Sequence, residues 1–97
     1  MPEQKCPLCK QVAKYKGVHF GRNKYFRCPN CKDFVIALSI EENVAGLKQE
    51  IREHFSRQSS ALKSDSVLLI YATEPVAETS ELKGEEQPKD KWIEYRP

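Results

Sequence analysis

Four cysteines give the clearest chemical signal in this sequence, because they fall into two Cys-x-x-Cys pairs. Cys6 and Cys9 form the first pair, Cys28 and Cys31 form the second, and 18 residues separate the pairs. Zinc accepts four thiolates in a tetrahedron, and this spacing matches the four-cysteine zinc pattern, whose insert is about 15–20 residues long. We therefore predict one structural Zn²⁺ ion bound by all four cysteines.

Disulfides are the main alternative use of four cysteines. The first five residues, Met-Pro-Glu-Gln-Lys, contain no apolar stretch of the kind found in a secretion signal. The longest apolar run, residues 67–72, is too short to cross a bilayer. We therefore expect a cytoplasmic protein with no membrane partner, in a compartment where thiols stay reduced and bind metals. A thioredoxin-like redox role and an iron–sulfur cluster both fit this sequence context less well.

A zinc ion with four protein thiolates has no open position for water or a substrate. The only histidines, His19 and His54, do not stand beside a nucleophile motif. We therefore predict a protein without enzymatic activity and without a small-molecule substrate.

The elements that would position the cysteines follow from the residue pattern around them. Residues 12–20 and 24–27 are predicted strands, with a turn at residues 21–23, and residues 34–38 are a third strand rich in β-branched and aromatic side chains. Together they predict a three-stranded zinc ribbon over residues 1–38. With 97 residues and a mean hydropathy of -0.67, the chain has a thin core, which a bound metal would help to stabilise.

One amphipathic helix is predicted after the ribbon. Ser39 and Glu42 form the capping-box pattern, and an apolar stripe then extends to about residue 57. The stripe consists of Ile40, Val44, Leu47, Ile51 and Phe55. An apolar run at residues 67–71 predicts one further strand, so that residues 39–72 would pack on the ribbon.

The C-terminal residues 73–97 have a different composition. Residues 74–90 carry six acidic residues, two prolines and few hydrophobic residues, which predicts a flexible acidic linker. An aromatic segment follows at residues 92–96. The predicted fold class is therefore small α+β: a three-stranded zinc ribbon, one helix, one further strand and a flexible acidic C-terminal segment.

Charge is divided unevenly along the chain. Residues 1–33 contain eight Lys or Arg and two acids, a net charge of +6, whereas residues 34–97 carry -4. Such asymmetry indicates an anionic partner for the basic part, and nearby aromatic rings could stack on bases. Tyr15, Phe20 and Phe26 fit equally well as core residues. The candidate nucleic-acid-binding residues are Lys14, Lys16, Arg22, Lys24, Arg27 and Lys32.

Protein interaction is the other predicted function. The helical stripe offers an apolar docking face, unless it is buried in the chain's own core, and the aromatic C-terminus could dock on a partner or on its own domain. The candidate partner-binding residues are Leu47, Ile51, Phe55, Trp92, Ile93 and Tyr95. The partner would be another protein or a second copy in a homodimer.

The knuckle sequences Cys6-Pro-Leu-Cys9 and Tyr25-Phe-Arg-Cys28-Pro-Asn-Cys31 resemble zinc ribbons of bacteria and phages. One similar group is the small restriction-alleviation proteins. Another is the N-terminal ribbons of bacterial defence and signalling proteins, whose helix carries a segment similar to Ile51-Arg52-Glu53-His54. The resemblance implies a zinc-ribbon binding module of bacterial or phage origin. We favour a protein-interaction adaptor or regulator, with nucleic-acid binding through the basic ribbon hairpin as the alternative.

Overall fold

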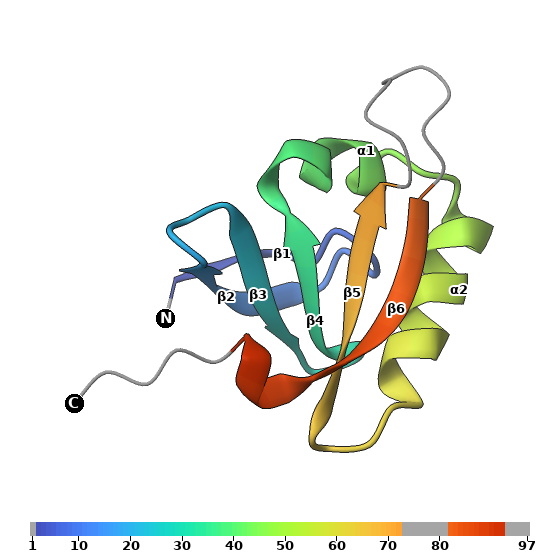
Figure 1. Cartoon of the computed structure of the whole chain (residues 1–97). Helices are drawn as coiled ribbons and strands as arrows, with labels where there is room; N and C mark the ends of the chain where they lie inside the picture. Colours follow the sequence, from blue (N-terminus) through green and yellow to red (C-terminus); the bar gives the residue numbers. More distant parts are fainter. Residues whose placement is uncertain (1, 73–81, 93–97) are drawn as a thin grey trace.

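A computed structural model describes residues 2–72 and 82–92 of the protein. Its centre is one six-stranded sheet in which the strands follow one another in sequence order (Figure 1). The strands are β1 (Glu3–Lys5), β2 (Val12–Val18), β3 (Asn23–Cys28), β4 (Lys32–Ala37), β5 (Ser66–Ala72) and β6 (Leu82–Pro88). All neighbours pair antiparallel except β4 and β5, which are parallel.

The parallel pair needs a crossover, and the helices provide it. A short 3-10 helix, η1 (Leu38–Ile40), is followed by α1 (Glu41–Ala45) and α2 (Gln49–Ser60). In Figure 1, α2 runs beside β5 and β6. A second 3-10 helix, η2 (Lys89–Lys91), follows β6. The small α+β class is therefore confirmed.

The single predicted helix is corrected to two helices with a break between them. Gly46 ends α1, where its N–H bonds the Glu42 carbonyl, and Lys48 is extended at φ -59° and ψ 149° before α2 begins. Glycine weakens a helix interior by about 1 kcal/mol relative to alanine, which explains the break. Ser39 forms no capping hydrogen bond, because Ala37 occupies the N-cap position of η1.

The predicted three-stranded ribbon with one extra strand is also corrected, because the sheet contains β1 and β6 as well. Residues 82–88, which composition predicted to be flexible, form β6 and pair with all of β5. Gly84 lets the strand lie close to its neighbours, since a Cβ there would come within 2.9 Å of the Leu68 side chain. The predicted segments 1–38, 39–72 and 73–97 thus each contribute at least one strand to the same sheet.

The sheet buries side chains on both faces. One face packs against α2 and contains the larger cluster, with Phe26, Phe34 and Ile36 next to Phe55 of the helix. The other cluster consists of Val18, Tyr25, Val35, Val67 and Trp92. Trp92, only 5% exposed, follows η2 and closes this second cluster.

Candidate metal centre

The four cysteines come together as the sequence predicted. Cys6 and Cys9 lie in the turn between β1 and β2, while Cys28 and Cys31 flank the turn between β3 and β4. Their four Sγ atoms lie within 4.8 Å of one another, with Cys6 to Cys31 at 3.9 Å and Cys9 to Cys28 at 3.4 Å. Zinc–sulfur bonds of about 2.3 Å require tetrahedral edges of about 3.8 Å. All four are free thiols, so the cluster fits a metal ion and contains no disulfide.

Main-chain amides around each turn face the sulfurs. The Leu8 and Cys9 amides bond Cys6 Sγ, and those of Asn30 and Cys31 bond Cys28 Sγ. Such bonds stabilise the charge of a thiolate, and a metal with four thiolate ligands needs this stabilisation.

The same left-handed backbone follows both turns. Lys10 has φ 68° and Lys32 has φ 65°, each directly after the second cysteine of its pair. The two halves of the site are therefore alike in backbone geometry as well as in sequence.

The thiols also influence one another's protonation. A hydrogen bond from Cys31 lowers the pKa of Cys6 to about 5, and the same bond raises the pKa of Cys31. Burial raises the pKa of Cys28 to about 11. The metal-free site therefore retains thiol protons at neutral pH, and an incoming cation must displace them.

Helix α2 supports both turns through a polar face that the sequence reasoning missed. Ser56 Oγ lies 3.0 Å from Cys31 Sγ, and the Ser59 hydroxyl donates to the Cys31 carbonyl at 2.6 Å. Arg52 Nη1 donates to the Leu8 carbonyl at 2.8 Å. The signal was present in the sequence, because residues 52, 56 and 59 recur at helical spacing.

Three of the six candidate nucleic-acid-binding residues share one face of the sheet. Lys14 lies opposite Arg27 in the β2–β3 register, and Lys16 lies two residues further along β2. Since side chains two apart on a strand point to the same face, these three cations form one group. Arg22 lies outside this group, in the turn that joins β2 and β3.

Lys24 lies on the opposite face. Its ammonium is 2.9 Å from Glu41, 2.8 Å from Gln4 and 4.6 Å from the centre of the Tyr15 ring. Lys24 thereby connects β3 to α1 and β1.

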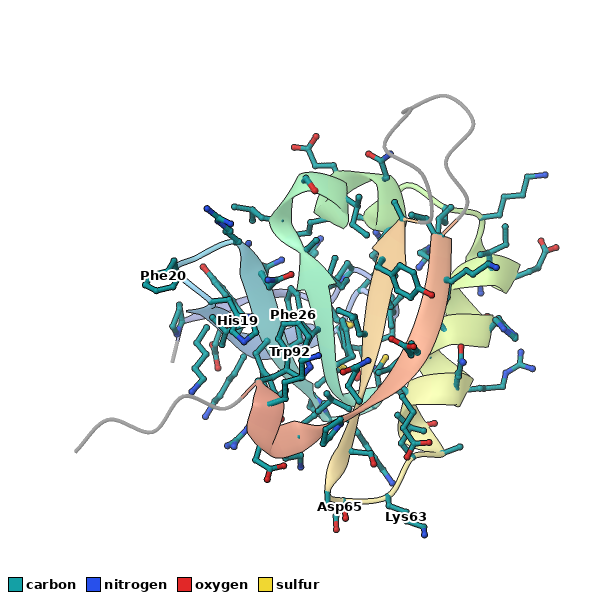
Figure 2. The ribbon with its side chains drawn as sticks, in the orientation of Figure 1. His19, Phe20, Phe26, Lys63, Asp65 and Trp92 are labelled. Atoms are coloured by element: carbon teal, nitrogen blue, oxygen red, sulfur yellow. The ribbon has the colours of Figure 1, made fainter. Side chains whose placement is uncertain are left out.

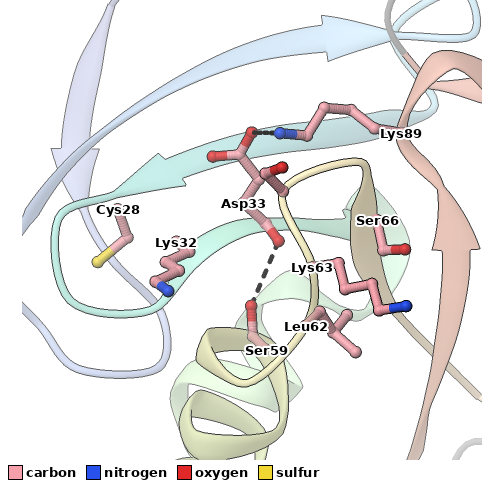
Figure 3. A pocket seen from close by; sticks show the side chains of 9 residues that line it. Cys28, Lys32, Asp33, Ser59, Leu62, Lys63, Ser66 and Lys89 are labelled. Atoms are coloured by element: carbon pink, nitrogen blue, oxygen red, sulfur yellow. Dashed lines mark hydrogen bonds and ion pairs between the residues drawn. The ribbon is translucent and has the colours of Figure 1, made fainter.

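Lys32 lines a separate pocket of about 410 Å³ between the β3–β4 turn, the end of α2 and η2 (Figure 3). Lys63 and Lys89 also line it, and Lys89 forms an ion pair with Asp33, with Nζ 3.3 Å from Oδ2. In Figure 3 the ammonium groups of Lys32 and Lys63 point in different directions, so they do not converge on one point.

Three of the six candidate partner-binding side chains pack in the protein's own core. Phe55 and Trp92 are buried, and Leu47 packs partly buried against the larger cluster. Ile51 is 43% exposed. Ile93 and Tyr95 lie outside the described residues.

No family model, curated protein or solved structure matches this chain. The resemblance to bacterial and phage zinc ribbons therefore stays a prediction. Among the described residues, no helix is long and apolar enough to cross a membrane.

Proposed function

We propose that this chain is a nucleic-acid-binding module stabilised by one structural zinc ion. The observation that carries the proposal is the basic face, which we define as the exposed or half-exposed cations Lys5, Lys14, Lys16 and Arg27. Lys5 pairs with Val12, and Lys14 pairs with Arg27, so all four project from the same side of β1–β3. Glu3 is the one acid of these three strands, and it lies on the same side, opposite Lys14.

Zinc is the metal that best suits the site. Four thiolates in a small tetrahedral cluster favour zinc among the common divalent ions, and four protein ligands make the site structural. The ion would tie the β1–β2 turn to the β3–β4 turn and so hold β2 and β3, which carry most of the basic face. Metal analysis of the purified protein is expected to give one zinc per chain.

A shallow groove beside the basic face supports the choice of ligand. It measures about 310 Å³ and is lined by Val12 and Pro29 together with two cations, Lys14 and Arg27, and one acid, Glu3. Arg27 is only loosely paired, with Nε 4.0 Å from Asp33. Apolar contacts flanked by cations suit a nucleotide, whose base is apolar on its flat faces and whose phosphate is anionic.

Fluorescence anisotropy with labelled DNA and RNA oligonucleotides tests this function. We expect binding that weakens steeply between about 50 and 200 mM salt. Lys14→Glu and Arg27→Glu should weaken it further and each should reduce the salt slope by about 1. Lys48→Glu makes the same charge change on the helical side and should leave binding intact. Equal binding by all three variants, or none by the native chain, would refute the proposal.

Protein interaction is the second candidate function, and two exposed apolar side chains favour it. Leu38 is 50% exposed and Ile51 is 43% exposed. The rest of the described stripe packs inward, which leaves a small docking area. Self-association in light scattering that disappears with Ile51→Glu would support this function.

A further inference from the structure

Phe20 is the most exposed large hydrophobic side chain among the described residues. It sits at the tip of the turn between β2 and β3, 98% exposed, and points away from the sheet (Figure 2). Its φ of 62° lies in the left-handed region, which costs a non-glycine residue roughly 1–2 kcal/mol. The ring buries almost nothing, so the fold gains no stability from phenylalanine at this position.

The backbone of the turn is nevertheless anchored on both sides of Phe20. The preceding His19 stacks on Trp92, with 4.4 Å between ring centres and 13° between planes, and its Nε2 lies 3.2 Å from the Lys91 carbonyl. On the other side, the Leu38 N–H donates to the Arg22 carbonyl at 2.9 Å. An exposed ring on an anchored turn is preorganised for contact with a ligand.

The cations of β2 and of its turn favour an anionic ligand beside the ring. Arg22 is exposed in the same turn, and no acidic residue occurs between Glu3 and Asp33. From the tip, β2 leads back through Lys16 and Lys14, whose positions are about 6.6 Å apart along the strand. The cations of the basic face thus continue from the ring towards the groove at Val12.

We propose that Phe20 is a stacking platform for an unpaired base, and that the ligand of the basic face is single-stranded nucleic acid. This inference rests on the proposed function and specifies its ligand. The strand lies along β2, with a base against Phe20 and its phosphates near Arg22, Lys16 and Lys14. In a duplex the bases already stack on one another, so the ring finds a free base face only in a single strand or at a strand end.

The test compares one labelled single strand of about 12 nucleotides with the same sequence as a blunt duplex. The native protein should bind the single strand more tightly. Phe20→Ala should weaken single-strand binding by roughly 5- to 150-fold and change duplex binding little. Phe20→Trp should restore the affinity and add a fluorescence signal that the stacked base quenches.

Phe20→Gly separates binding from folding. Because glycine accepts φ 62° without strain, this variant should melt at a higher temperature than the native protein and still lose single-strand affinity. Ile51→Ala, which removes an exposed apolar side chain on α2, is the matched control and should bind normally.

The outcomes distinguish this inference from the proposed function. If Phe20→Ala binds like the native protein while Lys14→Glu does not, the stacking role is wrong and the basic face stands. Equal affinity for single strand and duplex would also overturn the inference. If the native protein binds no oligonucleotide, both proposals fail, and Phe20 then becomes a candidate contact for a protein partner.

Discussion

At the scale of single residues, Asp33 links three parts of the molecule. Its Oδ2 accepts a hydrogen bond from the Tyr25 hydroxyl at 2.6 Å and lies 3.3 Å from Lys89 Nζ. Tyr25 belongs to the smaller core cluster, and Lys89 begins η2, which leads to Trp92. Burial and the nearby Asp33 carboxylate raise the pKa of Tyr25 above its usual value of 10.0. The phenol must therefore stay protonated for this contact to exist.

We predict that Tyr25→Phe lowers the free energy of unfolding by about 1–2 kcal/mol at neutral pH, because it removes a hydrogen bond to a carboxylate. The native pKa is raised above the unfolded one, so the Tyr25 contribution is complete below about pH 10 and is lost as pH rises beyond it. Urea unfolding at about pH 7, 9 and 11 should show a gap between native and variant that narrows only at the highest pH.

Tyr15→Phe is the matched control for this prediction. Tyr15 packs partly buried against the larger cluster, and its hydroxyl forms no hydrogen bond within residues 2–72 and 82–92. It should lower stability much less than Tyr25→Phe does. If the difference in free energy of unfolding between the native protein and Tyr25→Phe stays constant through the alkaline range, the linkage between this phenol and folding is contradicted.

At the scale of elements, α2 contacts the rest of the protein through an apolar face and a polar face. Phe55 packs into the larger cluster, while Arg52, Ser56 and Ser59 bond the two cysteine turns. The apolar stripe was evident in the sequence, because burial imposes a period on residue type. The polar face was not recognised, since only the fold shows which carbonyls and sulfurs these polar side chains meet.

We predict that Ser59→Ala lowers the free energy of unfolding by about 1–3 kcal/mol. The Ser59 hydroxyl is buried and donates to the Cys31 carbonyl at 2.6 Å, and it also lies 3.3 Å from the Asp33 carbonyl. Removing it leaves these acceptors short of a partner inside the protein. Thermal unfolding followed by circular dichroism measures the loss.

Ser60→Ala provides the control on the next residue of the same helix. Among the described residues, its hydroxyl donates a hydrogen bond to the Arg57 carbonyl alone, one turn earlier and near solvent. This variant should be close to the native protein in stability. If Ser59→Ala and Ser60→Ala behave alike, the contact between α2 and the second cysteine turn does not support the fold.

The strands show where sequence reasoning succeeds and where it stops. The positions of β2, β3 and β4 followed from turn residues and β-branched side chains, which are local signals. The edge strand β6 has few apolar side chains and is held by main-chain hydrogen bonds to β5. Amino-acid composition does not indicate main-chain hydrogen bonds, and for this reason the acidic composition of residues 74–90 predicted a flexible segment.

The strand register, as well as the sequence, is needed to tell which basic residues share a face of the sheet. Eight Lys or Arg in residues 1–33 indicated an anionic partner, but they did not reveal which ones share a face. The register separates Lys14 and Arg27 from Lys24, whose ammonium is held by Glu41. The basic face on the Lys14 side is therefore smaller than the charge count alone implied.

At the scale of the whole molecule, the cysteine cluster belongs to the core. Cys6, Cys28 and Cys31 are members of the larger cluster, in contact with the residues that join the sheet to α2. A thin core leaves a chain of 97 residues little other stability. The metal site and the fold should therefore form together.

We predict that removing the proposed zinc with EDTA lowers the melting temperature by at least roughly 10 °C, because structural zinc contributes directly to folding free energy. EDTA already saturated with zinc is the control and should have no effect. Circular dichroism should show loss of sheet and helix in one transition, since α2 contacts the cysteine turns. Removal of the metal with an unchanged melting temperature would mean that the hydrophobic clusters suffice to hold the fold.

The same experiment has a pH dependence of known sign. Burial raises the pKa of Cys28 to about 11, and the bond to Cys6 raises that of Cys31, so both thiols are protonated when the metal is absent. Each zinc ion must displace these protons, and its apparent affinity therefore falls as pH falls. A competition assay with a chelating dye, corrected for the dye's own pH dependence, should give a lower apparent zinc affinity at about pH 5.5 than at pH 7.5. Equal apparent affinities at the two pH values would contradict proton displacement from these thiols.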